Sequence, residues 1–304
     1  MHLLKSLRIG ALALATLSLP ALAAPVVFGY SGAMQSFTAA VAGTYVVTAV
    51  GAQGGHGTID GGSFVGGRGA SITGSFDLAA GDTFWLAVGG EGSSFAGSYN
   101  GGGGGGSFFV SASGTPLLVA GGGGGIRAYA SQNGCDASIT AYGVLGSGGS
   151  PTSACDSKVD DLGLGGDVSS DSYGSAGAGF YGNGASDLSY GQGGLAWANG
   201  MLGGSDAAVA SYCTSIGGFG GGGSGSGCGG GGGGGGYSGG DGAFIGGGGG
   251  SWNTGYDQLA LSGVGYGNGL ISIDFVGAVP EPQSLALLLV ALLAAGAATK
   301  RRRG

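Results

Sequence analysis

Five runs of consecutive glycine constrain this chain more than any other feature of its sequence. They lie at residues 101–106, 121–125, 220–223, 229–236 and 246–250. Glycine supplies 82 of the 304 residues, against a usual share of roughly 7%. A long helical bundle is excluded, because glycine costs about 1 kcal/mol per residue in a helix interior. Collagen is excluded because the chain has 6 prolines and no strict Gly-X-Y period.

A free polyglycine run is normally a flexible linker, since it has no side chain to bury. Two features favour an ordered alternative here. The runs recur, and three of the five lead into apolar segments, which are Ser107-Phe108-Phe109, Ile126 and Tyr237. In the ordered alternative the runs lie side by side in a polyproline-II-like conformation, and their bare backbones come close enough to hydrogen-bond to one another.

Stretches rich in β-branched and aromatic residues predict short strands. The expected strands cover residues 44–50, 70–78, 83–88, 107–111, 116–120 and, far downstream, 269–276. In 70–78, Ile72, Phe76 and Leu78 alternate onto one face. We expect Trp85 in the core, and Trp197 and Trp252 against glycine strands. The spacing predicts an all-β sandwich or jelly roll, with strands mainly in 25–120 and 269–277 and a polyglycine-rich insert at 121–268.

The N-terminus has the pattern of a secretory signal peptide covering residues 1–23. Lys5 and Arg8 form a positive region, residues 9–19 are apolar, and small residues precede the expected cut after Ala23. The alternative is an uncleaved anchor. We expect signal peptidase to act on this segment during export across the inner membrane.

The C-terminal residues 279–304 have a second tripartite pattern. A short polar motif precedes an apolar helix at 285–298 and a basic cluster; the motif is Val279, Pro280, Glu281 and Pro282, and the cluster is Lys300, Arg301, Arg302 and Arg303. The cations are expected to stay cytoplasmic. The segment resembles the PEP-CTERM sorting signal of Gram-negative bacteria. The resemblance implies transient membrane anchoring, recognition and cleavage by an exosortase, and release to the cell surface or an exopolysaccharide matrix. The alternative is an ordinary C-terminal membrane anchor.

Removal of both ends makes the exported part strongly acidic. Residues 24–278 hold 3 basic side chains (Arg68, Arg127 and Lys158) and 15 acidic ones, a balance of −12. Nucleic-acid binding requires a basic surface, so this class of partner is excluded. We expect exopolysaccharide or other matrix components as partners.

All four cysteines lie in the exported part, at Cys135, Cys155, Cys213 and Cys228. An even number of cysteines in an oxidising compartment predicts two disulfides. Three pairings can be drawn, and we favour the local pairs Cys135–Cys155 and Cys213–Cys228, which each bracket a loop near glycine runs. A zinc site is disfavoured, because the chain has no C-x-x-C and His56 is the one histidine outside the signals.

The segment 213–250 contains, in order, Cys213, a Gly-Gly-Phe-polyglycine run at 217–223, Cys228, polyglycine at 229–236 and Tyr237. This segment resembles the glycine-rich ectodomain of the anaplastic lymphoma kinase and leukocyte tyrosine kinase receptors. The resemblance extends more loosely over 35–276. It implies a tumour-necrosis-factor-like β-sandwich joined to a bundle of polyglycine-II helices. The cytokine-binding function is not implied for this chain, which has no kinase.

Two further sequence patterns resemble sites of catalysis or metal binding, and both resemblances are weak. Ser238 lies in a G-x-S-x-G pattern, but polyglycine supplies neither the strand nor the helix that a nucleophile elbow needs, and no catalytic residues are expected. An acidic segment holds Asp156, Asp160 and Asp161, whose oxygens could bind Ca²⁺, although a solvated acidic loop is favoured. No other cofactor is expected.

Together these patterns predict an exported, non-enzymatic structural protein of the cell surface or the exopolysaccharide (biofilm) matrix. The alternative is a surface adhesin or a module that binds a ligand or glycan, with exposed aromatic side chains as the contact groups.

Overall fold

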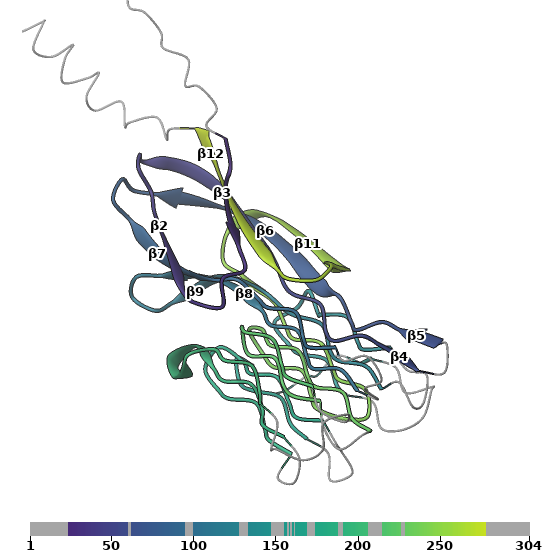
Figure 1. The fold of residues 1–304 in the computed structure, drawn as a ribbon. Helices are drawn as coiled ribbons and strands as arrows, with labels where there is room; N and C mark the ends of the chain where they lie inside the picture. Colours follow the sequence, from purple (N-terminus) through teal and green to yellow (C-terminus); the bar gives the residue numbers. More distant parts are fainter. Residues whose placement is uncertain are drawn as a thin grey trace, which may run out of the picture.

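Two five-stranded antiparallel sheets face each other in the upper part of the molecule (Figure 1), so the predicted all-β sandwich is confirmed. The computed structural model describes residues 24–59, 62–94, 100–127, 133–146, 155–156, 158, 160, 162–168, 174–187, 191–205, 215–225 and 229–277.

The first sheet has the strand order β1-β12-β3-β6-β11. Its strands are β1 (Val26–Gly29), β12 (Leu270–Gly277), β3 (Gly43–Val50), β6 (Gly69–Leu78) and β11 (Tyr256–Gly265). The second sheet has the order β10-β9-β8-β7-β2. Its strands are β10 (Trp252–Asn253), β9 (Pro116–Ala120), β8 (Ser107–Ser111), β7 (Thr83–Ala87) and β2 (Gln35–Thr38). A small hairpin of β4 (Gly57–Ile59) and β5 (Gly62–Phe64) and a 3-10 turn at η1 (Trp197–Asn199) complete the described elements.

Alternating side chains of the two sheets fill the space between them. Tyr45, Val47 and Ala49 of β3 alternate with half-buried residues, as expected for a strand with one face in the core. The first sheet also contributes Ile72, Phe76, Leu78, Ile271 and Ile273, and the second contributes Phe84, Leu86, Phe109, Leu118 and Ala120. The sequence placed Ile72, Phe76 and Leu78 on one face, and all three are buried there.

The expected core position of Trp85 is wrong. Phe84 and Leu86 are buried at 5% and 0% exposure, whereas Trp85 is 43% exposed. Successive residues of a strand point to opposite faces. Burial of Phe84 and Leu86 in the sandwich therefore places Trp85 on the outer face of the second sheet.

The second sheet is buried on much of its outer face as well. Phe108, Val110 and Val119 pack there against Phe180, Met201, Phe219 and Tyr237 from the glycine-rich part of the chain. Trp252 stacks on Tyr237 with 4.6 Å between ring centroids, and Trp197 stacks on Phe180 at 5.5 Å. These aromatic pairs join the sandwich to the structure below it.

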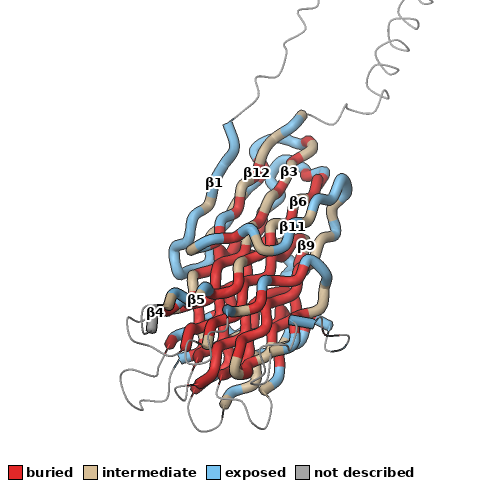
Figure 2. The backbone as a smooth tube through the Cα atoms, turned by 90° about the vertical axis from the view of Figure 1, so that its right-hand side faces the viewer, coloured by how far each residue is buried: buried red, intermediate tan, exposed pale blue. Residues whose placement is uncertain are grey.

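The glycine-rich segments form a layered lattice of extended chains below the sandwich (Figures 1 and 2). Several of them are direct continuations of sandwich strands: residues 51–55 follow β3, 89–93 follow β7, and 121–126 follow β9, while 101–106 precede β8. Nearly all residues of this lattice are buried (Figure 2). The lattice therefore extends the strands of the sandwich beyond the sheets.

The run 101–106 shows how the lattice is built. Its successive N–H groups point to three different neighbouring segments and return to the same neighbour every third residue. The pairs, with N···O distances of 2.8–3.3 Å, are Gly101–Ile126 and Gly104–Gly123, Gly102–Ser93 and Gly105–Gly90, and Gly103–Gly223 and Gly106–Gly220. A repeat of three residues is the helical repeat of the polyproline-II conformation.

The carbonyl groups of the same run accept hydrogen bonds from three further directions. The donors are the N–H groups of Gly232, Gly55, Gly218, Gly235 and Ala52. The run thus contacts six surrounding segments, and residues 121–126 are surrounded in the same manner, by segments that include 67–70, 232–235 and 246–249. This is the predicted polyglycine-II bundle, and we call it the glycine bundle.

One hairpin in the glycine bundle depends on glycine for its backbone conformation. The limbs 215–218 and 222–225 are joined by a turn in which Gly220 and Gly221 have φ values of 97° and 85°. Residues with a Cβ rarely adopt such values. The turn places the two limbs on adjacent sides of the run 101–106.

The expected insert at 121–268 requires two corrections. Strands β10 and β11 lie inside this range, and β11 pairs with β6 in the first sheet. The glycine bundle also begins earlier, because residues 51–55 and 89–93 belong to it. The sequence 256–265 was missed as a strand because most of its residues on both faces are exposed, which removes the alternation of polar and apolar residues.

Buried serines close the bundle where its runs end. Ser107 and Ser251 follow directly after glycine runs, and their exposures are 0% and 2%. The Ser251 hydroxyl donates to the Ser138 carbonyl at 2.6 Å and accepts the Gly121 N–H at 3.0 Å. Ser107 likewise donates to the Val50 carbonyl and accepts the Gly89 N–H. These hydroxyls replace backbone partners that the ending run no longer supplies.

Substitution of Gly103 by alanine is predicted to destabilise the protein by more than about 2 kcal/mol, as overpacked interiors are, because the added Cβ would overlap the Gly233 carbonyl. Gly29→Ala is the matched control, since a Cβ there meets nothing within 4 Å. Urea denaturation of both variants measures the difference. Equal midpoints for Gly103→Ala and the unaltered protein would contradict the close packing of the bundle.

Ser251→Ala is predicted to lower the free energy of unfolding by about 1–3 kcal/mol, because it leaves a buried N–H and a buried carbonyl without their partner. Ser36→Ala, at an exposed position of β2, serves as the control and should change stability by less than about 0.5 kcal/mol. Equilibrium denaturation of the two variants provides the comparison, and an equal effect of both would argue against the role of Ser251.

Candidate functional site

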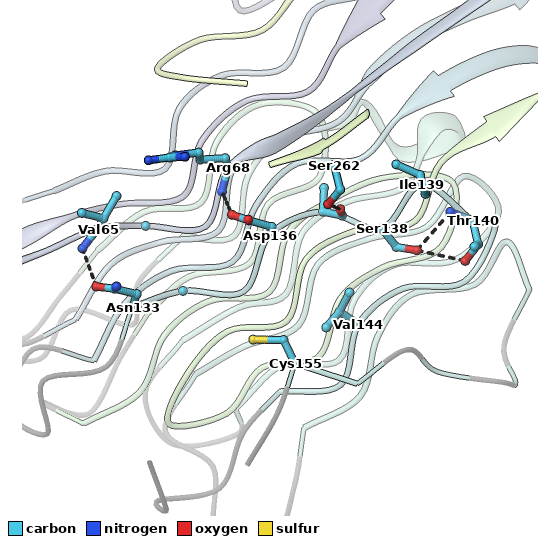
Figure 3. Close-up of a pocket in the computed structure, with 13 residues that line it drawn as sticks. Val65, Arg68, Asn133, Asp136, Ser138, Ile139, Thr140, Val144, Cys155 and Ser262 are labelled. Carbon is cyan, nitrogen blue, oxygen red and sulfur yellow. Dashed lines mark hydrogen bonds between the residues drawn. The ribbon is translucent and has the colours of Figure 1, made fainter. Parts of the chain in front are cut away.

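An open groove lies where the first sheet meets the glycine bundle (Figure 3). It has a volume of about 600 Å³, within the range of roughly 300–1,000 Å³ typical of ligand sites. Four parts of the chain form it: residues 65–68 just before β6, residues 133–144, Cys155, and Ser262 of β11. We call it the junction groove.

Backbone hydrogen bonds to side chains fix two polar residues on the wall of the junction groove. The Val65 N–H donates to Asn133 Oδ1 at 2.9 Å, and the Arg68 N–H donates to Asp136 Oδ1 at 2.7 Å (Figure 3). Both Asn133 and Asp136 are exposed. Their second polar atoms, Asn133 Nδ2 and Asp136 Oδ2, have no hydrogen-bond partner among the described residues.

Hydroxyl groups line the next part of the groove. The Ser138 and Thr140 hydroxyls are 2.9 Å apart, and the Thr140 N–H also donates to Ser138 Oγ (Figure 3). The Ser262 hydroxyl donates to the Ala137 carbonyl at 2.6 Å. Val65, Ile139 and Val144 supply the apolar part of the lining.

Arg68 supplies the one cationic side chain among the described residues that line the groove. Its guanidinium carbon lies 4.4 Å from the centroid of the exposed Tyr266 ring, a cation–π contact. No carboxylate of the described residues lies within ion-pair distance of it. Asp136, whose carboxylate also lines the groove, is held by the Arg68 backbone N–H and makes no ion pair with the guanidinium.

A smaller hollow of about 210 Å³ lies beside the junction groove. Ile139 lines both, and the hollow adds Trp252, Asn253 and Gln258 among its walls. Gln258 donates its amide N–H groups to the carbonyls of Asn253 and Gly255, and its Oε1 atom is not engaged by the described residues. The groove and the hollow together present hydrogen-bonding groups interspersed with apolar surface, which suits a polar ligand with apolar faces.

The cysteine prediction is confirmed for one pair. Cys135 and Cys155 form a disulfide with 5.6 Å between their Cα atoms, and Cys155 lines the junction groove. Cys213 and Cys228 lie outside the described residues, so their pairing stays a prediction.

The predicted sorting signals also lie outside the described residues: residues 1–23, the motif at Val279–Pro282, the apolar segment 285–298 and the basic cluster at 300–303. Within the part of the chain that the structure describes, no helix has the length and hydrophobicity required to span a bilayer.

Lys158, which lies within the acidic segment, makes an ion pair with two aspartates from other parts of the chain. Lys158 is 4% exposed at its side chain, and its Nζ lies 2.8 Å from Asp241 Oδ1 and 3.4 Å from Asp167 Oδ2. Asp156 and Asp160 are exposed, Asp161 lies outside the described residues, and no group of three metal-ligating side chains occurs among the described ones. Calcium binding stays a prediction.

Ser238 is buried, and its hydroxyl group is hydrogen-bonded to backbone groups. It is 2% exposed, its hydroxyl donates to the Ala141 carbonyl at 2.6 Å, and it accepts the Gly163 N–H at 2.8 Å. His56 contacts Ser94 and Glu91. Ser238 therefore closes the bundle in the way that Ser107 and Ser251 do.

An exposed carboxylate on the first sheet has an altered pKa. Hydrogen bonds from the Thr44 and Tyr256 hydroxyls lower the pKa of Asp77. This carboxylate lies at the end of β6 away from the bundle and does not contribute to the junction groove.

Comparison with known proteins returned no match for this chain, either among protein-family models or among curated proteins.

The polar residues of the junction groove were missed in the sequence. Arg68, Asn133, Asp136 and Ser262 come from three separate segments and form no motif. One signal was present: Arg68 is one of three basic residues in the range 24–278, and such rarity could have singled it out.

Removal of the Cys135–Cys155 bridge is predicted to lower the stability of the fold by about 3 kcal/mol, the value expected for a closed loop of this size. The double variant Cys135→Ser/Cys155→Ser, compared with the unaltered protein in guanidinium under non-reducing conditions, measures the loss. A denaturation midpoint that does not change would show that the bridge adds nothing to stability.

Proposed function

We propose that this chain is an exported, non-enzymatic structural protein of the cell surface or of an exopolysaccharide (biofilm) matrix. The observation that supports this proposal most directly is the glycine bundle. Its interior is backbone bonded to backbone, with few side chains that could perform chemistry. A rigid body with saturated hydrogen bonds suits a load-bearing or protease-resistant component.

In this proposal the two terminal signals direct the export and processing of the chain. Signal peptidase removes residues 1–23, the segment 285–298 anchors the chain in the inner membrane for a time, and an exosortase cuts at the motif that resembles PEP-CTERM. The bridge between Cys135 and Cys155 is the kind of crosslink that persists in an oxidising compartment, which supports export.

A second candidate function is a surface adhesin or a module that binds a glycan. The junction groove favours it, because amide, carboxylate, guanidinium and hydroxyl groups line one open channel. The two functions are compatible, since a matrix protein that holds a polysaccharide does both.

Mass spectrometry of the exported protein tests the route. We expect a product that begins at Ala24 and ends near Pro280. The variant Pro280→Ala/Pro282→Ala should keep its tail and stay with the cells, whereas Gln283→Ala, which lies beside the motif, should be processed normally. Export of a product that retains residues 285–304 would overturn exosortase processing.

Deletion of the gene tests the role itself. A structural matrix protein should leave growth unchanged and lower the cohesion of the biofilm, measured by rheometry, and re-expression should restore it. Unchanged cohesion together with catalytic turnover by the purified protein would overturn the structural proposal.

A further inference from the structure

We propose that the junction groove binds an acidic oligosaccharide segment, with the carboxylate of a uronic-acid unit held by Arg68. This inference rests on the proposed location in a polysaccharide matrix and names the chemical class of the polysaccharide. It goes beyond a structural role because it assigns a binding site and its central residue.

The charge of Arg68 is the first argument. The exported part contains 15 acidic and 3 basic side chains, and both other cations have partners. Lys158 pairs with Asp241, and the Arg127 guanidinium lies 3.9 Å from the Phe244 ring centroid. Arg68 alone among the three lines the groove, and its guanidinium keeps its planar donors for a carboxylate, which it can bind through two parallel hydrogen bonds.

The remaining polar atoms match the hydroxyls of a sugar ring. Asn133 Nδ2 is a donor, Asp136 Oδ2 is an acceptor, and the Ser138 and Thr140 hydroxyls can act as either. The backbone N–H groups of Val65 and Arg68 hold the first two side chains in place. Such preorganised groups lose little side-chain entropy on binding.

The apolar surface of the groove fits the C–H faces of the same rings. Val65 and Ile139 are 38% and 46% exposed, and both line the junction groove. Ile139 also lines the neighbouring hollow, together with Gln258 and Trp252. A short oligosaccharide therefore suits the site, because its further units can contact this second hollow.

The acidic character of the whole protein sets the conditions of binding. A balance of −12 repels an acidic polymer at long range, and this repulsion is screened beyond about 8 Å at physiological ionic strength. Binding therefore depends on the local contact with Arg68 and is best measured near 0.15 M salt.

Isothermal titration calorimetry of the exported form (residues 24–278) with defined oligosaccharides tests the inference. The probes are hexamers of galacturonate and of mannuronate, the methyl ester of the galacturonate hexamer, and a neutral glucan hexamer. We expect an acidic hexamer to bind, and its methyl or neutral counterpart to bind at least about tenfold more weakly, as the loss of a charge-assisted hydrogen bond predicts.

Two variants locate the site. Arg68→Gln should weaken binding of the acidic hexamer at least about tenfold with an unchanged melting temperature. Val41→Glu alters the net charge by the same amount at an exposed loop next to β3, at the opposite end of the sandwich from the groove, and should leave binding unchanged. Asn133→Ala gives an independent check that does not alter charge, and a several-fold loss is expected.

Three outcomes would overturn the inference: no binding of either acidic hexamer, equal binding of acidic and neutral hexamers, or acidic binding that survives Arg68→Gln. None of these touches the gene-deletion result, so the matrix role can stand while this inference fails. Loss of matrix cohesion in the Arg68→Gln strain, with export unaltered, would connect the two.

Discussion

Hydrogen bonds between backbones that carry no side chains are the interaction on which the rest of this molecule depends. Chains in the glycine bundle lie so close that a Cβ on Gly103, Gly123 or Gly233 would overlap a neighbouring carbonyl. This proximity allows the run 101–106 to bond in six directions, whereas a strand in a sheet bonds in two. The free energy gained from these hydrogen bonds must offset the large conformational entropy that glycine loses on folding. It does so because nearly all buried backbone N–H and C=O groups have a hydrogen-bond partner. The sandwich is in turn fixed to this lattice, because its own strands run into it.

The sequence predicted the parts that follow a simple period. Strands β3, β6, β8, β9 and β12 lie within about one residue of their expected bounds, because β-branched and aromatic residues cluster there. Trp85 was misplaced because its size was weighed above its position between Phe84 and Leu86. Strand β11 was missed because it is an edge strand with both faces largely exposed. The segments 51–55 and 89–93 were not predicted to lie in the bundle, because they are not glycine runs. They can lie there because only some of their positions closely face a neighbouring backbone, and the other positions can carry a side chain.

The candidate site lay beyond sequence reasoning for a different reason. The junction groove exists only once the glycine bundle has brought residues 133–144 beside the start of β6 and Ser262 of β11. Its two fixed side chains are oriented by backbone N–H groups 68 positions away in the sequence. The Cys135–Cys155 disulfide was favoured among three possible pairings because the two cysteines bracket a local loop near glycine runs. A groove assembled from four separate parts of the chain was not predictable, since its residues share no pattern along the sequence.

Because the run 101–106 repeats every three residues, the length of a glycine run determines which neighbour each later N–H group faces. The effect is comparable to that of a reading frame. Each residue added or removed turns the following donors by a third of a turn, so that every later N–H faces a different neighbour. Three residues added or removed restore the original directions. A glycine run therefore tolerates insertions or deletions of whole turns of three residues. Insertion or deletion of a single residue changes the hydrogen-bond partner of every later residue in the run, although polyglycine looks like the most permissive of sequences.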